Sequence, residues 1–256
     1  MGTEGKKPLV SVVMPSYNME SFIEEAISSV IAQSVSDWEL IVIDDCSKDN
    51  TRKIVADFAE KDSRIQLVVN EENMGVAKTR NRGLTMSRGK FVALLDSDDY
   101  WKPQMLEKMV ARAEETGADI IYCSYELVDE QGKKVCNDFI VPEETTFEES
   151  IVRSVILPSA ALITAALAKE ARFPTNMYHE DIALWFQLLK EGKTARGVTE
   201  PLVLYRQRAG GRSSDKIISA CRRWPIYRKH LGMPLFQSIR AMVQYAYYGL
   251  IKYKRV

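Results

Sequence analysis

The chain has 256 residues, of which 46% are hydrophobic and 27% charged, a balance typical of a globular protein with a substantial core. Its formal net charge is zero, yet residues 206–256 hold twelve Lys or Arg against one acid, Asp215, so this basic end indicates an anionic partner such as phosphate, nucleic acid or a lipid surface. The four cysteines are scattered without a CxxC pair, which argues against a structural zinc site or a disulfide scaffold and fits a reducing compartment.

The first half of the chain predicts strands that alternate with helices. Short apolar runs, typical of buried parallel strands, occupy 9–14, 39–43, 65–69, 91–95 and 120–122. Apolar residues recur at helical intervals between them, and Ser21 with Glu24 has the spacing of a capping box at the start of the first helix. Strands separated by helices imply a parallel sheet covered on both faces, with right-handed crossovers.

After about residue 125 the alternation ends. A polar turn surrounds Gly132, an acidic loop follows at 142–149, and a helix is expected at 181–190 before a strand at 202–206. We expect this mixed half to be fused onto the first, in one domain over 1–215 with halves at about 8–125 and 126–215. A helical, basic and aromatic tail over 216–256 follows.

Three polar clusters fall where predicted strands end, which is where ligands bind in open parallel sheets. They are Pro15-Ser16-Tyr17-Asn18, Asp44-Asp45 and Asp96-Ser97-Asp98-Asp99. Two carboxylates spaced by one residue, as in Asp96 and Asp98, can direct oxygens to one hard cation such as Mg²⁺ or Mn²⁺. The alternative is a solvated turn that caps the next helix.

The other candidates each have a structural alternative. A carboxylate at Asp44 or Asp45 could accept from a base imide or a ribose hydroxyl, or could form an Asx-type turn. Tyr17 could stack on a base or pack as a half-buried aromatic. Arg80 lies on a predicted helix, and its default interpretation is a position on the solvated face of that helix. Asp181 at a helix start suits a general base that is kept ionised by the helix dipole, or an acidic cap.

Five segments, in this order and spacing over about residues 9–192, resemble the family 2 glycosyltransferases. They are VSVVMPSYN, ELIVIDDCSKDNT, NMGVAKTRNRGL, GKFVALLDSDD and HEDIALWFQLLKEG. The resemblance implies a GT-A fold, an α/β architecture in which a Rossmann-like, mostly parallel sheet flanked by helices binds the nucleotide and a mixed half binds the acceptor. It also implies direct displacement that inverts the anomeric centre.

The resemblance assigns roles to individual residues. Those expected at the donor are Pro15, Tyr17, Asp45, Arg80, Asp96 and Ser97, with Tyr17 and Asp45 at the base and Asp96 near the ribose. Asp98 is expected to bind the metal, Mn²⁺ or Mg²⁺. Of the Glu180-Asp181 pair, Asp181 is expected to be the general base and Glu180 to lie at the acceptor or diphosphate. The segment 205–216 resembles one that closes over the diphosphate, where Arg206, Arg208, Arg212 and Ser213 offer donors to phosphate oxygens.

The sequence departs from the processive synthases, because it has no QxxRW motif and no stretch of about 18 uninterrupted apolar residues. We therefore expect one sugar, most often carried by UDP in this family, to be added to a glycan or lipid-linked acceptor. The tail either contacts a membrane with anionic lipids or packs on the core as a helical appendage. The N-terminus lacks an apolar segment of signal-peptide length, so we expect a cytoplasmic protein, peripheral on the inner membrane face if the tail binds lipid.

Rival classes are disfavoured by particular residues. A nucleotidyltransferase or a dinucleotide oxidoreductase would carry a Gly-rich loop after the first strand, and PSYNMES is not one. A nucleic-acid binder has no support in the acidic first part. The remaining alternative is a non-catalytic nucleotide-sugar-binding scaffold. The presence of the candidate catalytic and metal-binding residues Asp96, Asp98 and Asp181 argues against it.

Overall fold

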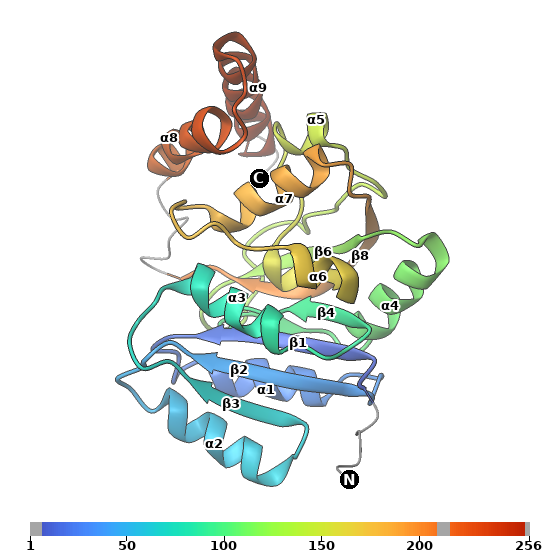
Figure 1. Ribbon diagram of the computed structural model, residues 1–256, viewed down its shortest axis with the longest axis vertical. Helices are drawn as coiled ribbons and strands as arrows, with labels where there is room; N and C mark the ends of the chain where they lie inside the picture. The colour runs from blue at the N-terminus through green and yellow to red at the C-terminus, as the bar shows by residue number, and fades with distance from the viewer. Residues whose placement is uncertain (1–6, 209–215, 254–256) are drawn as a thin grey trace.

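The computed structural model describes residues 7–208 and 216–253, with side chains described for 7–208 and 221–248. Figure 1 shows a sheet flanked by helices, with the C-terminal helices at one end of the long axis. The strands are β1 (Val10–Ser16), β2 (Trp38–Asp44), β3 (Ile65–Val69), β4 (Phe91–Leu94), β5 (Tyr100–Trp101), β6 (Ile120–Val128), β7 (Ala161–Thr164) and β8 (Ala195–Arg206). The α-helices are α1 (Ile23–Ile31), α2 (Thr51–Lys61), α3 (Val76–Met86), α4 (Met105–Thr116), α5 (Phe147–Ser150), α6 (Ala165–Glu170), α7 (Glu180–Lys190), α8 (Lys216–Pro225) and α9 (Leu235–Tyr253). A 3₁₀ turn, η1 (Pro158–Ala160), and a π-helical turn, η2 (Ile226–His230), complete them.

The described strands form one sheet in the order β3-β2-β1-β4-β7-β6-β8-β5. The first four are mutually parallel, so their carboxyl ends share one edge. β7 pairs antiparallel with both β4 and β6, and β8 runs parallel to β6 and antiparallel to β5. The antiparallel β7 thus joins the two predicted halves in a single continuous sheet.

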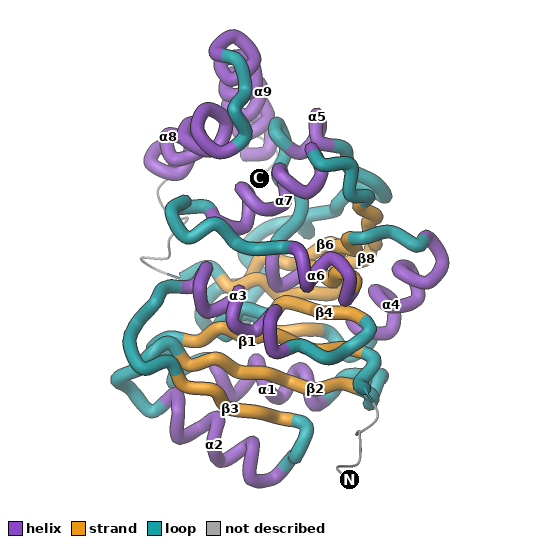
Figure 2. The backbone as a smooth tube through the Cα atoms, in the orientation of Figure 1, coloured by secondary structure: helices purple, strands orange, loops and turns teal. Residues whose placement is uncertain are grey.

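Alternation along the buried strands gives each face of the sheet its own core. In β1, Val10, Val12 and Met14 pack in a cluster with α1 and α4, whereas Val13 points to a second cluster built on α3, α6 and α7. This follows from the two-residue period of a strand, which turns successive side chains to opposite faces. Figure 2 shows helices on both sides of the strands, as the predicted covered sheet requires.

Gly83 brings α3 close to the sheet, and we expect Gly83→Ala to destabilise the protein. A Cβ at this position would lie 2.3 Å from Val13 Cγ1 and 2.8 Å from Ile43 Cδ1. Overpacking of this kind costs about 1–3 kcal/mol in the free energy of unfolding. Urea denaturation would measure the loss, with Lys78→Ala on the exposed side of the same helix as the control. Equal midpoints for the two variants would contradict the tight contact.

The predicted capping box at Ser21 and Glu24 is wrong. α1 begins at Ile23 after Phe22, and no side chain caps it. The reason is a preceding turn, in which the backbone N–H groups of Phe22 and Ile23 both donate to the Met19 carbonyl, so Ser21 lies inside that turn. A capping box forms instead at Thr146 and Glu149, before α5. The short strands β5 and β7 were also not predicted.

The C-terminal helices pack on α7. Ile226 and Tyr227 of η2 and Ala241 of α9 form a buried cluster with Ala183 and Phe186 on the outer side of α7. The rings of Phe186 and Tyr227 stack with their centroids 6.2 Å apart. The predicted packing of the tail on the core is therefore present. None of the helices in the described part is both long enough and apolar enough to cross a bilayer.

Candidate active site

The carboxyl ends of β1 and β2 lead into loops with unusual backbone. Asn18 and Cys46, which follow these strands, have φ angles of 53° and 65°. Non-glycine residues rarely adopt this region, and such conformations cluster at functional sites. Tyr17, beside Asn18, is 39% exposed, so its ring is open to a ligand at this edge.

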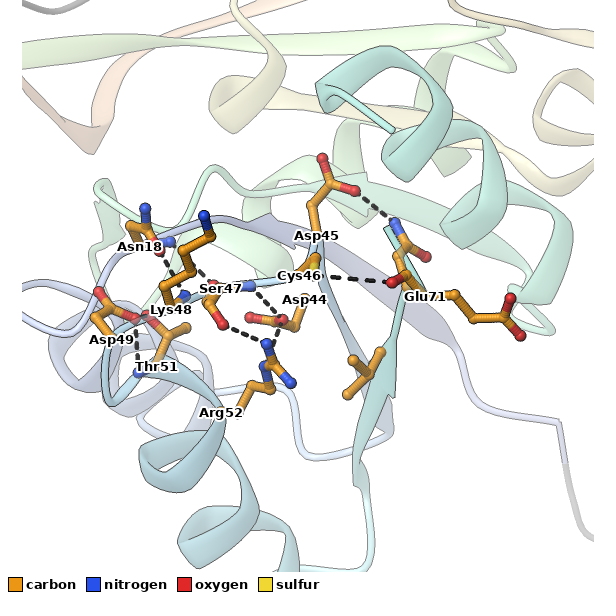
Figure 3. A network of polar contacts seen from close by, with 12 residues as sticks. Asn18, Asp44, Asp45, Cys46, Ser47, Lys48, Asp49, Thr51, Arg52 and Glu71 are labelled. Atoms are coloured by element: carbon orange, nitrogen blue, oxygen red, sulfur yellow. Dashed lines mark hydrogen bonds and ion pairs between the residues drawn. The ribbon is translucent and has the colours of Figure 1, made fainter. Parts of the chain in front are cut away.

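Asp44 organises the loop after β2 (Figure 3). Its Oδ2 accepts from the Ser47 backbone N–H at 2.9 Å and pairs with Arg52 Nε at 3.1 Å. This bond spans three residues, so Asp44 closes the loop without forming the two-residue Asx turn of the structural alternative. Among the described residues, Asp44 Oδ1 and Ser16 Oγ are buried without a hydrogen-bond partner. Buried polar atoms are normally satisfied, so these two at adjacent strand ends are available to a ligand.

Asp45 holds the segment that leads into α3. Its carboxylate accepts from Asn70 Nδ2 at 2.8 Å and from the backbone N–H groups of Met74 and Gly75 at 2.9 and 2.8 Å. The side chain is buried, and its role as a base contact stays a prediction.

Arg80 is buried rather than part of a solvated helix face. One guanidinium nitrogen donates to Asp96 Oδ1 at 2.5 Å and another to Glu180 Oε1 at 2.8 Å. Burial alone would lower the pKa of Arg80, but Asp96 and Glu180 more than offset that effect and raise it. The guanidinium therefore stays charged and joins the carboxyl end of β4 to the first turn of α7, 100 residues later.

The Asp96–Asp99 segment is fixed by partners from distant elements. Asp96 N–H donates to Ser159 Oγ at 3.0 Å, and that hydroxyl donates to Asp99 Oδ2 at 2.5 Å. Asp98 pairs with Arg208 Nε at 2.8 Å. Ser97 is buried, and its role at the donor stays a prediction.

Burial and mutual repulsion shift the titration of these carboxyls. Burial and the charge of Asp96 raise the pKa of Asp98 above its ordinary value, against the opposing effect of Arg208 and Arg206. Burial and the neighbouring Asp98 and Asp96 raise the pKa of Asp99 well above the ordinary range. Burial and mutual repulsion thus make full ionisation of these carboxyls unfavourable despite their arginine partners.

Glu180 and Asp181 open α7, where no side chain caps the helix. Glu180 is buried against Arg80, while Asp181 is half-buried beside it. Burial and the charge of Glu180 raise the pKa of Asp181, and Arg80 opposes this rise. Asp181 is therefore a carboxylate with raised basicity, as a general base requires.

Arg206 and Arg208 reach the acidic segment from the end of β8. The backbone N–H of Arg206 donates to Asp99 Oδ1 at 2.9 Å, and its Nε donates to the Asp98 carbonyl at 2.9 Å. Its guanidinium also bonds the Glu130 carbonyl and Glu25, so Arg206 is held within the chain. Arg208 is 30% exposed and lies at Asp98. Arg212 and Ser213 fall outside the described residues.

Ser159 and Glu25 contribute to this site and were not predicted, and Asp99 was predicted within a polar cluster but without a role of its own. Asp99 is the last acid of LLDSDD, but the interpretation of that motif concerned only the two carboxylates spaced by one residue, Asp96 and Asp98. A lone Ser159 in an apolar segment, and Glu25 among the polar positions of α1, have no sequence feature that sets them apart.

The residues at the β4 end suit a hard divalent cation. Asp98 and Asp96 are close enough for the charge of one to raise the pKa of the other, which a cation would relieve. The described residues contain no cluster of three or more His, Cys, Asp or Glu placed as metal ligands. One or two carboxylates are nevertheless the usual protein contribution where Mg²⁺ also binds substrate phosphates.

Comparison with known proteins gives consistent matches. The family model described as Glycosyl transferase family 2 matches residues 11–135. The putative teichuronic acid biosynthesis glycosyltransferase TuaG of Bacillus subtilis is 36% identical over 94% of this chain and 95% of its own length. The UDP-Glc:alpha-D-GlcNAc-diphosphoundecaprenol beta-1,3-glucosyltransferase WfgD of Escherichia coli is 33% identical over 96% of this chain and 95% of its own.

Solved structures confirm the predicted GT-A fold. S. aureus TarS 1–349 in complex with UDP-GlcNAc superposes with a TM-score of 0.74 at 24% identity, over 93% of this chain and 71% of that one. The mannosyltransferase PcManGT from Pyrobaculum calidifontis, in complex with GDP-Man and Mn²⁺, gives a TM-score of 0.63 at 21% identity, over 92% of this chain and 65% of that one.

Proposed function

Because the chain belongs to the family 2 glycosyltransferases, we propose that it is a metal-dependent, inverting enzyme that moves one sugar from a UDP-sugar to an acceptor hydroxyl. The acceptor is a glycan or a lipid-linked glycan in the synthesis of a surface polysaccharide, as the names of TuaG and WfgD suggest. The enzyme works in the cytoplasm, at the inner face of the membrane, with the basic tail 216–256 toward the lipid. Donor binding is assigned to residues 8–125 and acceptor binding to 126–215.

The observation that carries this proposal is the bridge made by Arg80. It joins Asp96, in the segment proposed for the donor and metal, to Glu180, the neighbour of the proposed base. A single buried guanidinium thus couples the donor side and the acceptor side of the reaction. The raised pKa of Asp181, a half-buried carboxyl beside this bridge, favours a catalytic site over a non-catalytic scaffold.

The reaction follows from these positions. Asp181 accepts the proton of the acceptor hydroxyl, whose oxygen forms a bond to the anomeric carbon as the bond to the diphosphate oxygen breaks. The proposal places the base on the side of the sugar opposite the leaving group, so that the configuration would invert. Asp98 and Asp96 would hold Mn²⁺ or Mg²⁺, which supplies Lewis-acid stabilisation of the leaving diphosphate. Arg208, at Asp98, offers further N–H donors to phosphate oxygens.

The proposed donor side contains two polar atoms without hydrogen-bond partners that a nucleoside could bind. The unpartnered Ser16 Oγ and Asp44 Oδ1 lie at the ends of β1 and β2, beside the exposed ring of Tyr17. Hydrogen bonds to a ribose or base would satisfy the two polar atoms. The ring of Tyr17 would stack on the base.

We expect nucleoside diphosphate release from one member of a panel of UDP-, GDP- and dTDP-sugars, in the presence of Mn²⁺ or Mg²⁺. EDTA should stop the release and Asp98→Ala should lower it by about tenfold or more, because the cation loses a ligand. Asp57→Ala, an exposed carboxylate on α2, is the matched control and should behave as the wild type.

Two outcomes of this assay would contradict different parts of the proposal. Release that resists EDTA and Asp98→Ala would exclude the metal from the proposal. Nucleotide binding without turnover, even with lipid-linked acceptors supplied, would favour the non-catalytic scaffold.

A further inference from the structure

The outward face of α9 is apolar and exposed. Phe236 is 80% exposed, Val243 63% and Tyr247 60%, and Ile239 lies on the same face at helical spacing. Of the eleven large apolar side chains that are exposed in the described part of the chain, six lie on this helix. We call Phe236, Ile239, Val243 and Tyr247 the apolar stripe. Such clustering marks an interaction site, whereas scattered exposed apolar residues do not.

The apolar stripe is not the face by which α9 is attached. Attachment uses the opposite side, where Ser238 and Ala241 are buried and the ring of Tyr245 stacks on the Arg223 guanidinium at 3.9 Å. To one flank, a groove of about 650 Å³ separates α9 from residues 142–155. The helix is therefore attached along one side only. It projects from the end of the molecule farthest from β3 (Figure 1).

All the charged residues in the segment that carries the apolar stripe are basic. Residues 216–256 contain no Asp or Glu and nine Lys or Arg: Lys216, Arg222, Arg223, Arg228, Lys229, Arg240, Lys252, Lys254 and Arg255. Arg223 is buried and Arg222 stacks on Tyr178 at 3.4 Å, so these two serve the packing of the tail. Arg228, Lys229 and Arg240 are exposed. Arg240 shares the face of Phe236 and Val243, so positive charge lies beside the apolar stripe.

We propose that α9 docks through the apolar stripe on an anionic lipid surface, lying in the plane of the interface. An apolar face with Lys and Arg around it, on a helix too polar to span, is the chemistry of interfacial helices. The exposed Arg228, Lys229 and Arg240 complement anionic headgroups. A second copy of the chain is a poorer occupant, because pairing two such stripes would bring together two segments of like charge.

Docking would also orient the proposed catalytic helix. Arg223 donates to Ser154 and lies 5.7 Å from the ring of Phe186, so α8 is fastened to α7 on the side away from the sheet. A membrane-bound α9 would hold α7, with Asp181 at its start, at a set angle to the bilayer. This consequence rests on the proposed function with a lipid-linked acceptor, whereas the docking itself does not.

Vesicle flotation of the full chain, without donor or acceptor, tests the docking. We expect binding to vesicles that contain 30% phosphatidylglycerol, much weaker binding to pure phosphatidylcholine, and a fall in binding as salt is raised. The double variant Phe236→Glu/Val243→Glu should lose at least tenfold in partition, since it removes the apolar contact and repels anionic lipid. Ile140→Glu, which changes an apolar residue that is 52% exposed elsewhere, should bind as the wild type.

Two results would overturn the proposal. One is unchanged partition of the double variant at an unchanged Tm. The other is a wild type that binds no vesicle and forms a dimer, with the dimer broken by the double variant. Donor hydrolysis in solution should be equal in wild type and double variant, so a failure of docking is distinguishable from a failure of the proposed enzyme activity.

Discussion

Replacement of Asp181 by asparagine should lower kcat for transfer to the acceptor by roughly 10²–10⁴-fold, the usual contribution of a general base. Asparagine has nearly the same shape, so the donor should still bind with about the wild-type Kd. Steady-state transfer and nucleotide binding by calorimetry would separate the two effects. Glu191→Gln, the same chemical change at the other end of α7, is the control. A loss of less than about tenfold would remove Asp181 from the role of base.

The pH dependence of transfer activity is a second test of Asp181 as the base. A base must be ionised, so activity falls as the pH drops through the pKa of Asp181. Burial and Glu180 raise that pKa, which places the acid limb at a higher pH than an ordinary aspartate would give. The residual activity of Asp181→Asn should lack this limb.

Arg80→Met should cost about 3–5 kcal/mol in the free energy of unfolding, because it leaves two carboxylates near the protein interior without their counter-ion. Glu180 and Asp96 both depend on this guanidinium, at 2.8 and 2.5 Å. Urea denaturation would measure the change. Lys90→Met, which breaks the exposed pair with Glu114, should cost less than about 1 kcal/mol.

Two further measurements separate the positioning role of Arg80 from simple destabilisation. Adding Glu180→Gln to Arg80→Met should recover part of the lost stability, since an amide needs no counter-ion, and the double-mutant cycle gives the coupling. The acid limb of activity should move to higher pH in Arg80→Met, because Arg80 lowers the pKa of Asp181. An unmoved limb, with stability equal to that of Lys90→Met, would contradict the bridge.

Much of the donor half could be predicted from the sequence, because its signals are local. The apolar runs that became β1 to β4 are short, rich in branched residues and stopped by polar clusters, and each cluster lies at the expected edge. The family resemblance was confirmed by the family model, which matches residues 11–135, and by a relative that is 36% identical over 94% of the chain.

The contacts that assemble the site could not be predicted, since they join distant positions. Arg80 looks like one of several basic residues on a polar helix, and only its partner Glu180, 100 residues away, explains why it is buried. The hydroxyl of Ser159 fixes Asp96 and Asp99 from 60 or more residues away. Asp45 was predicted to face the ligand, yet its visible partners belong to the 70–75 loop.

The position of β8 has a consequence for synthesis on the ribosome. β8 is the last strand in the described part of the chain, yet it lies between β6 and β5, and its final residue, Arg206, bonds Asp99 and Glu25. Until that residue leaves the exit tunnel, β6 has an open edge and the acidic segment lacks its anchor. A nascent chain with about four-fifths of its length made still lacks these contacts. We therefore expect a product truncated before residue 206 to be less stable than the full chain, because β6 keeps an open edge and Asp99 loses its bond to Arg206.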